Sequence, residues 1–151
     1  MFTRMREHIL RIGKARGFGI QSPWAFAFVT ELIGERLPYY AYADIDSKYA
    51  DRRERKLQKL MFRIRNFVHP HRAVIIDDIA SLNDSNASQL IHDAGQKGVI
   101  IIRNIWNSTE TQQRWHTLQQ RDDVGITFDL YDIGICFLDT HIYKQHYRLN
   151  F

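Results

Sequence analysis

The sequence predicts a small α/β protein with a mostly parallel, Rossmann-like sheet of about four to five strands. Three N-terminal helices precede this sheet, and an antiparallel hairpin closes it at the C-terminal end. The second half of the chain alternates short β-branched apolar runs with helical segments, which is typical of buried parallel strands joined by crossovers. The first half shows helical periodicity instead. With 151 residues we expect one domain, 1–151, made of a helical cap region, 1–70, and a shortened sheet region, 73–151.

The composition agrees with a folded protein. Hydrophobic residues make up 44% of the chain and aromatic residues 13%, so a core can form. The only cysteine, Cys136, lies in an apolar run and is predicted to be a small buried hydrophobe. We find no secretory signal and no apolar stretch near the ~20 residues of a membrane span, so we expect a cytoplasmic protein.

Helical signals dominate the first half. Residues 2–15 have the pattern of an amphipathic helix, and Ser22 followed by Pro23 predicts the start of a second helix over 24–33. We expect the segment 39–47 to be a loop.

A third helix follows this segment. It is predicted to begin at a cap supplied by Asp46 or Ser47 and to end at Pro70. Its apolar stripe consists of Leu57, Leu60, Met61, Ile64, Phe67 and Val68.

The second half changes period. The run Asn83-Asp84-Ser85 offers caps for one helix, and Asn107 or Ser108 offers a cap for another. The reversal over 132–134 predicts that the last strands pair antiparallel. We expect strands over 73–77, 98–102, 126–131 and 135–138, a further short strand or tail over 143–151, and helices over 86–95 and 109–120.

Motifs at both ends of the chain resemble one family. They are Gly17-Phe18-Gly19 with Ser22-Pro23, the run 37–42, and, near the C-terminus, 125–131, 134–135 and 144–147. Together they are similar to a bacterial O-methyltransferase-like family, chiefly from Bacteroidetes. The resemblance implies a seven-stranded sheet and dependence on S-adenosylmethionine. In that family a glycine-rich turn after the first strand lets the backbone approach the cofactor.

The middle of the chain departs from that pattern. The run 73–78 is followed by 79–83, which contains no glycine. It can correspond to the family's first strand with its glycines replaced, or to the fourth strand with the first three absent. In both alignments the chain is a shortened, degenerate relative, and no cofactor is expected.

Three polar residues remain as cofactor-binding candidates. Asp77, Asp78 and Asn104 are expected at the carboxyl ends of strands, where ligands bind in open α/β sheets. The family tends to place two metal-binding aspartates where this chain has Arg103 and Asn104. Because the arginine would oppose a cation, we expect no metal, and we identify no catalytic residue.

These observations favour a methyltransferase-like protein that lacks a recognisable S-adenosylmethionine site and works by binding or self-association. One alternative is a minimal S-adenosylmethionine-dependent O-methyltransferase. Another is a binder of nucleic acid or another anion, because residues 1–72 carry a net charge of +8 and residues 73–151 carry −4. The chain has no helix-turn-helix or RNP signature, which argues against nucleic acid.

Aromatic residues are dense near the N-terminus. Since a shortened sheet exposes edges that need cover, we expect the N-terminal helices to cover the sheet or to form a homodimer contact. The aromatic residues concerned are Trp24, Phe26, Phe28, Tyr39, Tyr40 and Tyr42.

Overall fold

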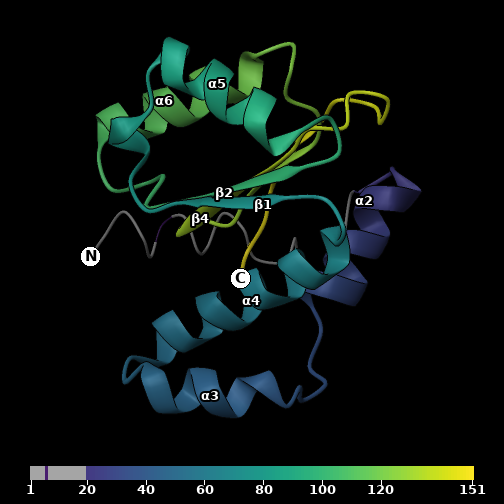
Figure 1. Ribbon diagram of the computed structural model, residues 1–151, viewed down its shortest axis with the longest axis vertical. Helices are drawn as coiled ribbons and strands as arrows, with labels where there is room; N and C mark the ends of the chain where they lie inside the picture. Colours follow the sequence, from purple (N-terminus) through teal and green to yellow (C-terminus); the bar gives the residue numbers. More distant parts are fainter. Residues whose placement is uncertain (1–5, 7–19) are drawn as a thin grey trace.

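The computed structural model describes residue 6 and residues 20–151 of the chain. Helices lie on both faces of a central sheet, as Figure 1 shows. Helices α5 (Asp84–Ala94) and α6 (Thr109–Gln120) cover one face, and α2 (Pro23–Ala27) and α4 (Arg52–Val68) lie on the other. This is the α/β class that the sequence predicts.

Over residues 20–151 the sheet has five strands in the order β1-β2-β4-β3-β5. The strands are β1 (Ala73–Ile76), β2 (Val99–Arg103), β3 (Thr127–Asp129), β4 (Ile133–Phe137) and β5 (His146–Arg148). The pairs β1/β2 and β3/β5 are parallel, whereas β2/β4 and β3/β4 are antiparallel. The sheet is therefore mixed, and the prediction of a mostly parallel sheet is wrong.

The difference arises from where the closing hairpin lies. Strands β3 and β4 pair as expected, but β4 enters between β2 and β3 and separates two strands that run in the same direction. The reversal also lies earlier than predicted, because Leu130 N–H donates to the Ile133 carbonyl and Gly134 belongs to β4. Gly134 faces Trp115 of α6, and a Cβ there would lie 2.5 Å from two carbons of the indole ring. This glycine is required for packing and not for a turn.

The helix predicted over 24–33 is confirmed as α2, which continues into a π-helical segment, η2 (Phe28–Ile33). Ser22 caps it by accepting a hydrogen bond from Ala25 N–H, and Pro23 follows as the first helical residue. The helix predicted over 2–15 lies outside the described residues.

The segment before α4 differs from the prediction. Residues expected to form a loop are helical, as α3 (Ala41–Lys48), and the next helix is capped by Asp51 and not by Asp46 or Ser47. Asp51 accepts a hydrogen bond from Glu54 N–H at 2.7 Å. Helix α3 buries none of its residues and packs against α4 through Tyr42, which lies beside Phe62. Its helical state therefore depends on a tertiary contact that an apolar stripe does not reveal.

The caps predicted at Asn83 and Ser108 are confirmed. Asn83 and Asn86 form a reciprocal capping box at the start of α5, and Ser108 and Thr111 form another at the start of α6. Both helices lie over the same face of the sheet. Helix α5 follows β1 and helix α6 follows β2, so the polar N-termini of both helices lie near the carboxyl ends of these two parallel strands.

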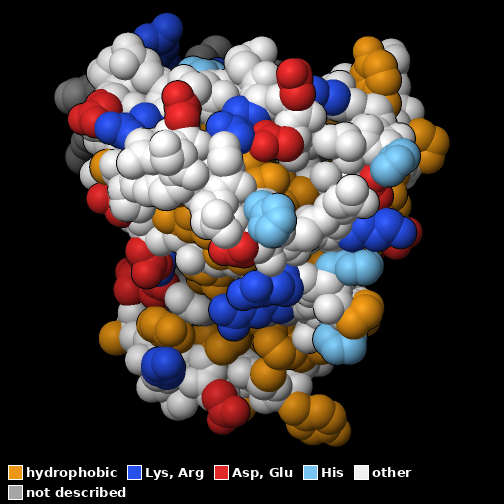
Figure 2. Space-filling view, turned by 45° about the horizontal axis from the view of Figure 1, so that its top comes forward, with side chains coloured by type: hydrophobic (Ala, Val, Ile, Leu, Met, Phe, Trp, Pro, Cys, Tyr) orange, Lys and Arg blue, Asp and Glu red, His pale blue; other side chains and the backbone are white. Residues whose placement is uncertain are grey.

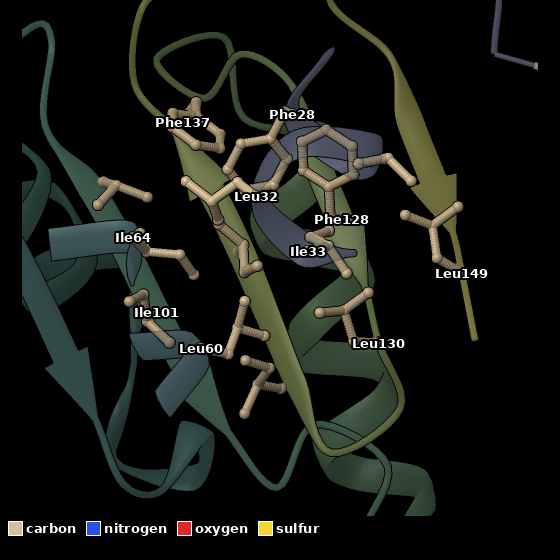
Figure 3. Packing of buried hydrophobic residues seen from close by; sticks show 14 of the residues in the cluster. Phe28, Leu32, Ile33, Leu60, Ile64, Ile101, Phe128, Leu130, Phe137 and Leu149 are labelled. Atoms are coloured by element: carbon tan, nitrogen blue, oxygen red, sulfur yellow. The ribbon is translucent and has the colours of Figure 1, made fainter. Parts of the chain in front are cut away.

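Two apolar clusters hold the layers together. One lies between the sheet and the N-terminal helices, and Figure 3 shows Phe28 among Phe128 and Phe137 there. The Phe28 ring centroid lies 4.7 Å from that of Phe128 and 5.0 Å from that of Phe137. The other cluster lies beneath α5 and α6 and surrounds the fully buried Trp115. The N-terminal helices thus cover one face of the sheet, which is one of the two roles expected for them.

Among the described helices, none is both long and apolar enough to cross a lipid bilayer.

Candidate functional site

The carboxyl edge of the sheet carries the candidate site. Strands β1, β2 and β3 run in the same direction, so their C-terminal ends meet at one edge together with the N-termini of α4 and α6. A hollow of about 740 Å³ opens there. Its walls include Glu54, Arg103, Asn104, Trp106, Ser108 and Tyr131.

The three predicted candidates lie at this edge but do not form one binding group. Asn104 lines the hollow, and its Nδ2 donates to the Asp77 carbonyl at 3.1 Å. The Asp77 side chain is 86% exposed and lies 3.7 Å from Arg103 Nη1. Asp78 instead caps the short helix η3 (Ile79–Ser81), and its carboxylate accepts from Ala80 N–H at 2.9 Å.

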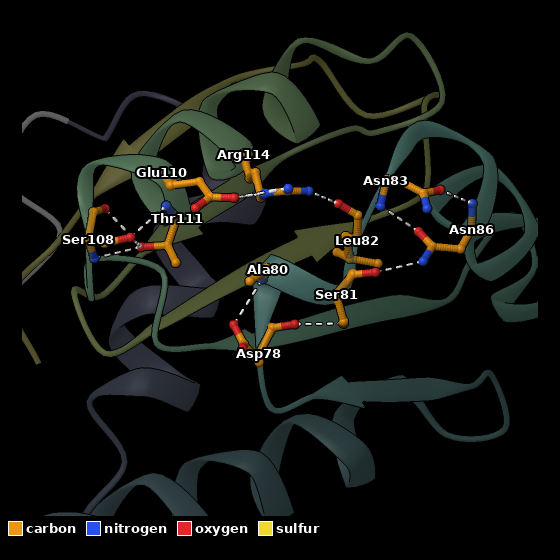
Figure 4. Close-up of polar contacts among 10 residues, drawn as sticks. All are labelled: Asp78, Ala80, Ser81, Leu82, Asn83, Asn86, Ser108, Glu110, Thr111 and Arg114. Carbon is orange, nitrogen blue, oxygen red and sulfur yellow. Dashed lines mark hydrogen bonds and ion pairs between the residues drawn. The ribbon is translucent and has the colours of Figure 1, made fainter.

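Every residue of the turn after β1 carries a side chain, and Figure 4 shows Asp78, Ala80, Ser81 and Leu82 of this turn. Ile79 is fully buried, and Ser81 Oγ donates to the Asp78 carbonyl at 2.7 Å. Two further donors fix the end of the turn, since Asn86 Nδ2 donates to the Ser81 carbonyl and Arg114 to the Leu82 carbonyl. A glycine-rich loop would leave the backbone accessible here, whereas this turn carries a side chain at each position, of which Ile79 is buried and Asp78, Ala80 and Ser81 are exposed.

Ion pairs close the other side of the hollow. Arg103, at the end of β2, meets Glu54 of α4 at 2.5 Å, and Arg53 pairs with Asp132 through two guanidinium nitrogens. Both pairs join the N-terminus of α4 to strand ends, so they hold the helical layer against the sheet. Arg103 Nε is buried and has no hydrogen-bond partner within the described part of the chain.

An aromatic and carboxylate cluster lies beside these pairs and was not predicted from the sequence. Asp129 is 3% exposed, and it accepts from Trp106 Nε1 at 2.8 Å and from Tyr131 N–H at 2.9 Å. The Trp106 and Tyr131 rings stack with centroids 5.7 Å apart, and the Arg148 guanidinium lies 4.9 Å from the indole centroid. These residues come from three separate segments, and neither the spacing of those segments nor the residue types indicate that they meet.

Backbone strain concentrates at the same edge. Asn104 has φ 58° and Tyr131 has φ 72°, which are the positive φ values among the described non-glycine residues. Asn104 N–H donates to the Asp132 carbonyl at 2.8 Å, so the two strained turns are joined. An aromatic residue in this conformation is unfavourable and persists where surrounding contacts determine it. The Asp129 bond to Tyr131 N–H and the stacked Trp106 supply such contacts.

The basic run at the start of α4 is paired in part. Asp46 of α3 lies 2.6 Å from Lys59 Nζ and 3.7 Å from Arg55 Nε, and Arg53 is paired with Asp132. In the space-filling view, charges of both signs are interspersed on the surface (Figure 2). Two of the cations at the start of α4, Arg53 and Arg55, are thus paired with carboxylates within the fold.

A more basic hollow lies between α4 and the C-terminal residues. It has a volume of about 850 Å³, and Arg36, Lys56, Lys59 and Arg63 line it. Burial, with Arg52 and Arg63 nearby, lowers the pKa of Lys56. Arg63 donates to the Leu32 carbonyl at 2.9 Å, so it stabilises the end of η2 and is committed to the fold.

Across the described residues, no three histidine, cysteine, aspartate or glutamate side chains come together in a way that could hold a metal ion. Cys136 is buried within β4, and desolvation raises the pKa of its thiol well above the usual range. A thiol of this kind is a poor nucleophile.

Comparisons with models of protein families, with curated proteins and with solved structures give no match for this chain. The geometry of the carboxyl edge therefore carries the functional argument.

Proposed function

We propose that this chain is a methyltransferase-like α/β protein without an S-adenosylmethionine site, which works through binding or self-association and not through catalysis. The observation that carries this proposal is that the turns directly after β1, β2 and β3 contain no glycine. On the first of the two alignments, the turn after β1 stands where the family has its glycine-rich turn. Its Ile79 side chain is fully buried and its carboxylate, hydroxyl and carbonyl groups are bonded within the fold. The turn carries a side chain at each position, whereas glycines would let a nucleoside lie against the backbone.

The position of β1 in the sheet supports the alignment in which β1 corresponds to the family's fourth strand and the first three strands are absent. In doubly wound sheets with the strand order 3-2-1-4-5-6, the first three strands all lie on one side of the fourth. Their absence would leave the fourth strand at an edge with the fifth beside it. Strand β1 lies at an edge with β2 parallel to it, and the described residues before β1 form helices. We therefore align β1 with the family's fourth strand.

Ion pairing at the carboxyl edge supports the same proposal. Arg103 and Arg53 would be suitable groups for an anionic ligand, but they face Glu54 and Asp132. A ligand that recruited either arginine would have to compete with these carboxylates for the guanidinium group. These pairs favour a structural role for this edge.

Isothermal titration with S-adenosylmethionine and S-adenosylhomocysteine tests the proposal. We expect no binding of either compound at concentrations up to about 1 mM, the weak end of specific affinities. Adenosine is the matched control for nonspecific contact with a nucleoside. Micromolar binding of S-adenosylmethionine or S-adenosylhomocysteine, with none for adenosine, would refute the proposal.

The hollow at the carboxyl edge favours a second candidate, a minimal S-adenosylmethionine-dependent O-methyltransferase. It lies where ligands bind in open α/β sheets, and Asn104 and Tyr131 are strained beside it. If this candidate holds, Asp77→Ala weakens binding of the cofactor. Asp93→Ala, which removes an exposed aspartate of α5, leaves it unchanged.

A binder of nucleic acid or another anion is the remaining alternative. The pairing of Arg53, Arg55 and Lys59 with carboxylates makes it the least supported of the three. It predicts retention on a polyanion column that persists at moderate salt, and early elution would contradict it.

A further inference from the structure

Among residues 20–151, no strand pairs with the outer rim of β1, which is therefore an edge of the sheet. Residues Ala73–Ile76 are apolar, half-buried and contain neither a charge nor a proline. Proteins commonly protect an edge strand with charged residues or proline, with bulges or with a covering segment. The strand at the opposite rim, β5, carries exposed His146 and Arg148. The two edge strands thus differ in composition, and β1 is the one suited to pairing with a further strand.

The pairing with β2 determines which backbone groups face outward. Val99 lies opposite Ala73, and its N–H donates to the Arg72 carbonyl at 2.9 Å. In a parallel pair of strands, when one residue directs its N–H and C=O toward the neighbouring strand, the residue opposite it directs its own N–H and C=O away. Val99 directs its groups toward β1, so Ala73 directs its groups away from β2. Ala73 and, by alternation, Ile75 therefore present their backbone groups at the open rim.

A second copy of this chain can use these groups. A closed dimer has two-fold symmetry, which requires the two β1 strands to run antiparallel. Outward-facing residues must then oppose one another, and an axis at Ile75 satisfies this condition. The facing pairs across the two chains are Ile75 with Ile75, Val74 with Ile76, Ala73 with Asp77, and Arg72 with Asp78.

Charge complementarity selects this register. It places exposed Arg72 opposite exposed Asp78 of the second copy, and symmetry repeats the pair at the other end. Moving the axis by one residue to Val74 would place Arg72 opposite apolar Ile76. Opposite charges that face each other across strands are stabilising, and like charges are destabilising.

The apolar clusters on the two faces of the sheet also suit this pairing. Ala73 and Ile75 pack with the cluster beneath α4, whereas Val74 and Ile76 pack with the cluster beneath α5 and α6. In the space-filling view, apolar side chains are visible in the band between the two helical layers (Figure 2). Joining two copies would therefore continue both clusters across the axis and cover the half-exposed β-branched side chains.

We propose that this protein forms a homodimer by antiparallel pairing of β1 with β1 of a second copy, centred on Ile75. The inference rests on the proposed self-associating function and names its surface and its partner. It differs from the expectation of a dimer formed by the N-terminal helices.

Sedimentation equilibrium with charge-reversal variants tests this dimer. The native chain is expected at twice its mass of 17.9 kDa at about 100 µM. Arg72→Glu and Asp78→Lys each place like charges at both ends of the ladder, so each is expected to weaken the dimer on the order of tenfold or more. An equimolar mixture of the two variants has two opposite-charge pairs and is expected to restore the dimer.

The mixture also separates pairing from folding, because variants that fail to fold cannot rescue one another. The control variant Lys48→Glu makes the same change of charge as Arg72→Glu, but on α3, which packs against α4. It should leave the dimer unchanged. A native chain that is monomeric at this concentration would overturn the inference, as would variants that dimerise like the native chain. Neither result bears on S-adenosylmethionine binding, which the titration measures independently.

Discussion

Replacing Gly134 with alanine tests the packing that allows β4 to lie in the middle of the sheet. The added methyl carbon would lie 2.5 Å from Trp115 Cη2 and Cζ3, about 1 Å closer than ordinary van der Waals contact. Trp115 is 1% exposed and Gly134 lies between β2 and β3, so neither the ring nor the strand can move without disturbing the core. The alanine is therefore expected to be destabilising.

The magnitude follows from two opposing terms. Overpacking a closed core costs typically ~1–3 kcal/mol. Replacing a strand glycine with alanine returns roughly 0.5–1 kcal/mol through the unfolded chain. We expect a net loss of about 1–2 kcal/mol in the free energy of unfolding, which for a chain of this size lowers Tm by roughly 3–8 °C.

Urea denaturation of Gly134→Ala, Trp115→Phe and the double variant measures this coupling. Phenylalanine lacks the outer ring carbons that the methyl group would meet, so Gly134→Ala should be neutral or stabilising in that background. The Trp115 Nε1–H is buried without a hydrogen-bond partner among the described residues, so removing the indole leaves no group stranded. Equal effects of Gly134→Ala in both backgrounds would refute the packing argument.

Three further predictions concern stability and reactivity. Burial, with Lys144 and His116 nearby, lowers the pKa of His146, so the unfolded state binds its proton more readily. Stability should therefore fall as the pH drops below about 6.5, and the urea midpoint should fall less in His146→Gln. Arg63→Met removes donors to the Leu32 and Ile33 carbonyls and is expected to cost roughly 2–3 kcal/mol in urea denaturation, whereas an unchanged midpoint would contradict its role. The Cys136 thiol should react with a disulfide reagent after unfolding in urea and not in the native protein.

Strong local signals predicted most elements correctly. Ser22-Pro23, Asn83 and Ser108 each begin a helix because their side chains satisfy backbone donors that the helix leaves open. Helix α3 was missed because it buries no side chain and its contacts lie on α4, outside its own segment. Propensity and periodicity describe a segment by itself, so a helix held by a neighbour escapes them.

The candidate site was predicted only in its location. Asp77, Asp78 and Asn104 lie at the carboxyl edge because parallel strands end together, which follows from strand direction alone. The side chains that shape the hollow come from α4, from the loop after β2 and from the turn after β3. Pairings such as Arg103 with Glu54 join residues far apart in the chain, and no local pattern encodes such a contact.

Local chemistry in the sequence determined the elements themselves: where helices are capped, which runs are apolar enough to be buried, and that the turn after β1 contains no glycine. Tertiary structure alone decided where the closing strand lies, since several antiparallel positions satisfy the same hairpin and packing against Trp115 distinguishes them. It likewise decided that β1 lies at an edge, because an edge is defined by which strands are neighbours and not by what any strand contains.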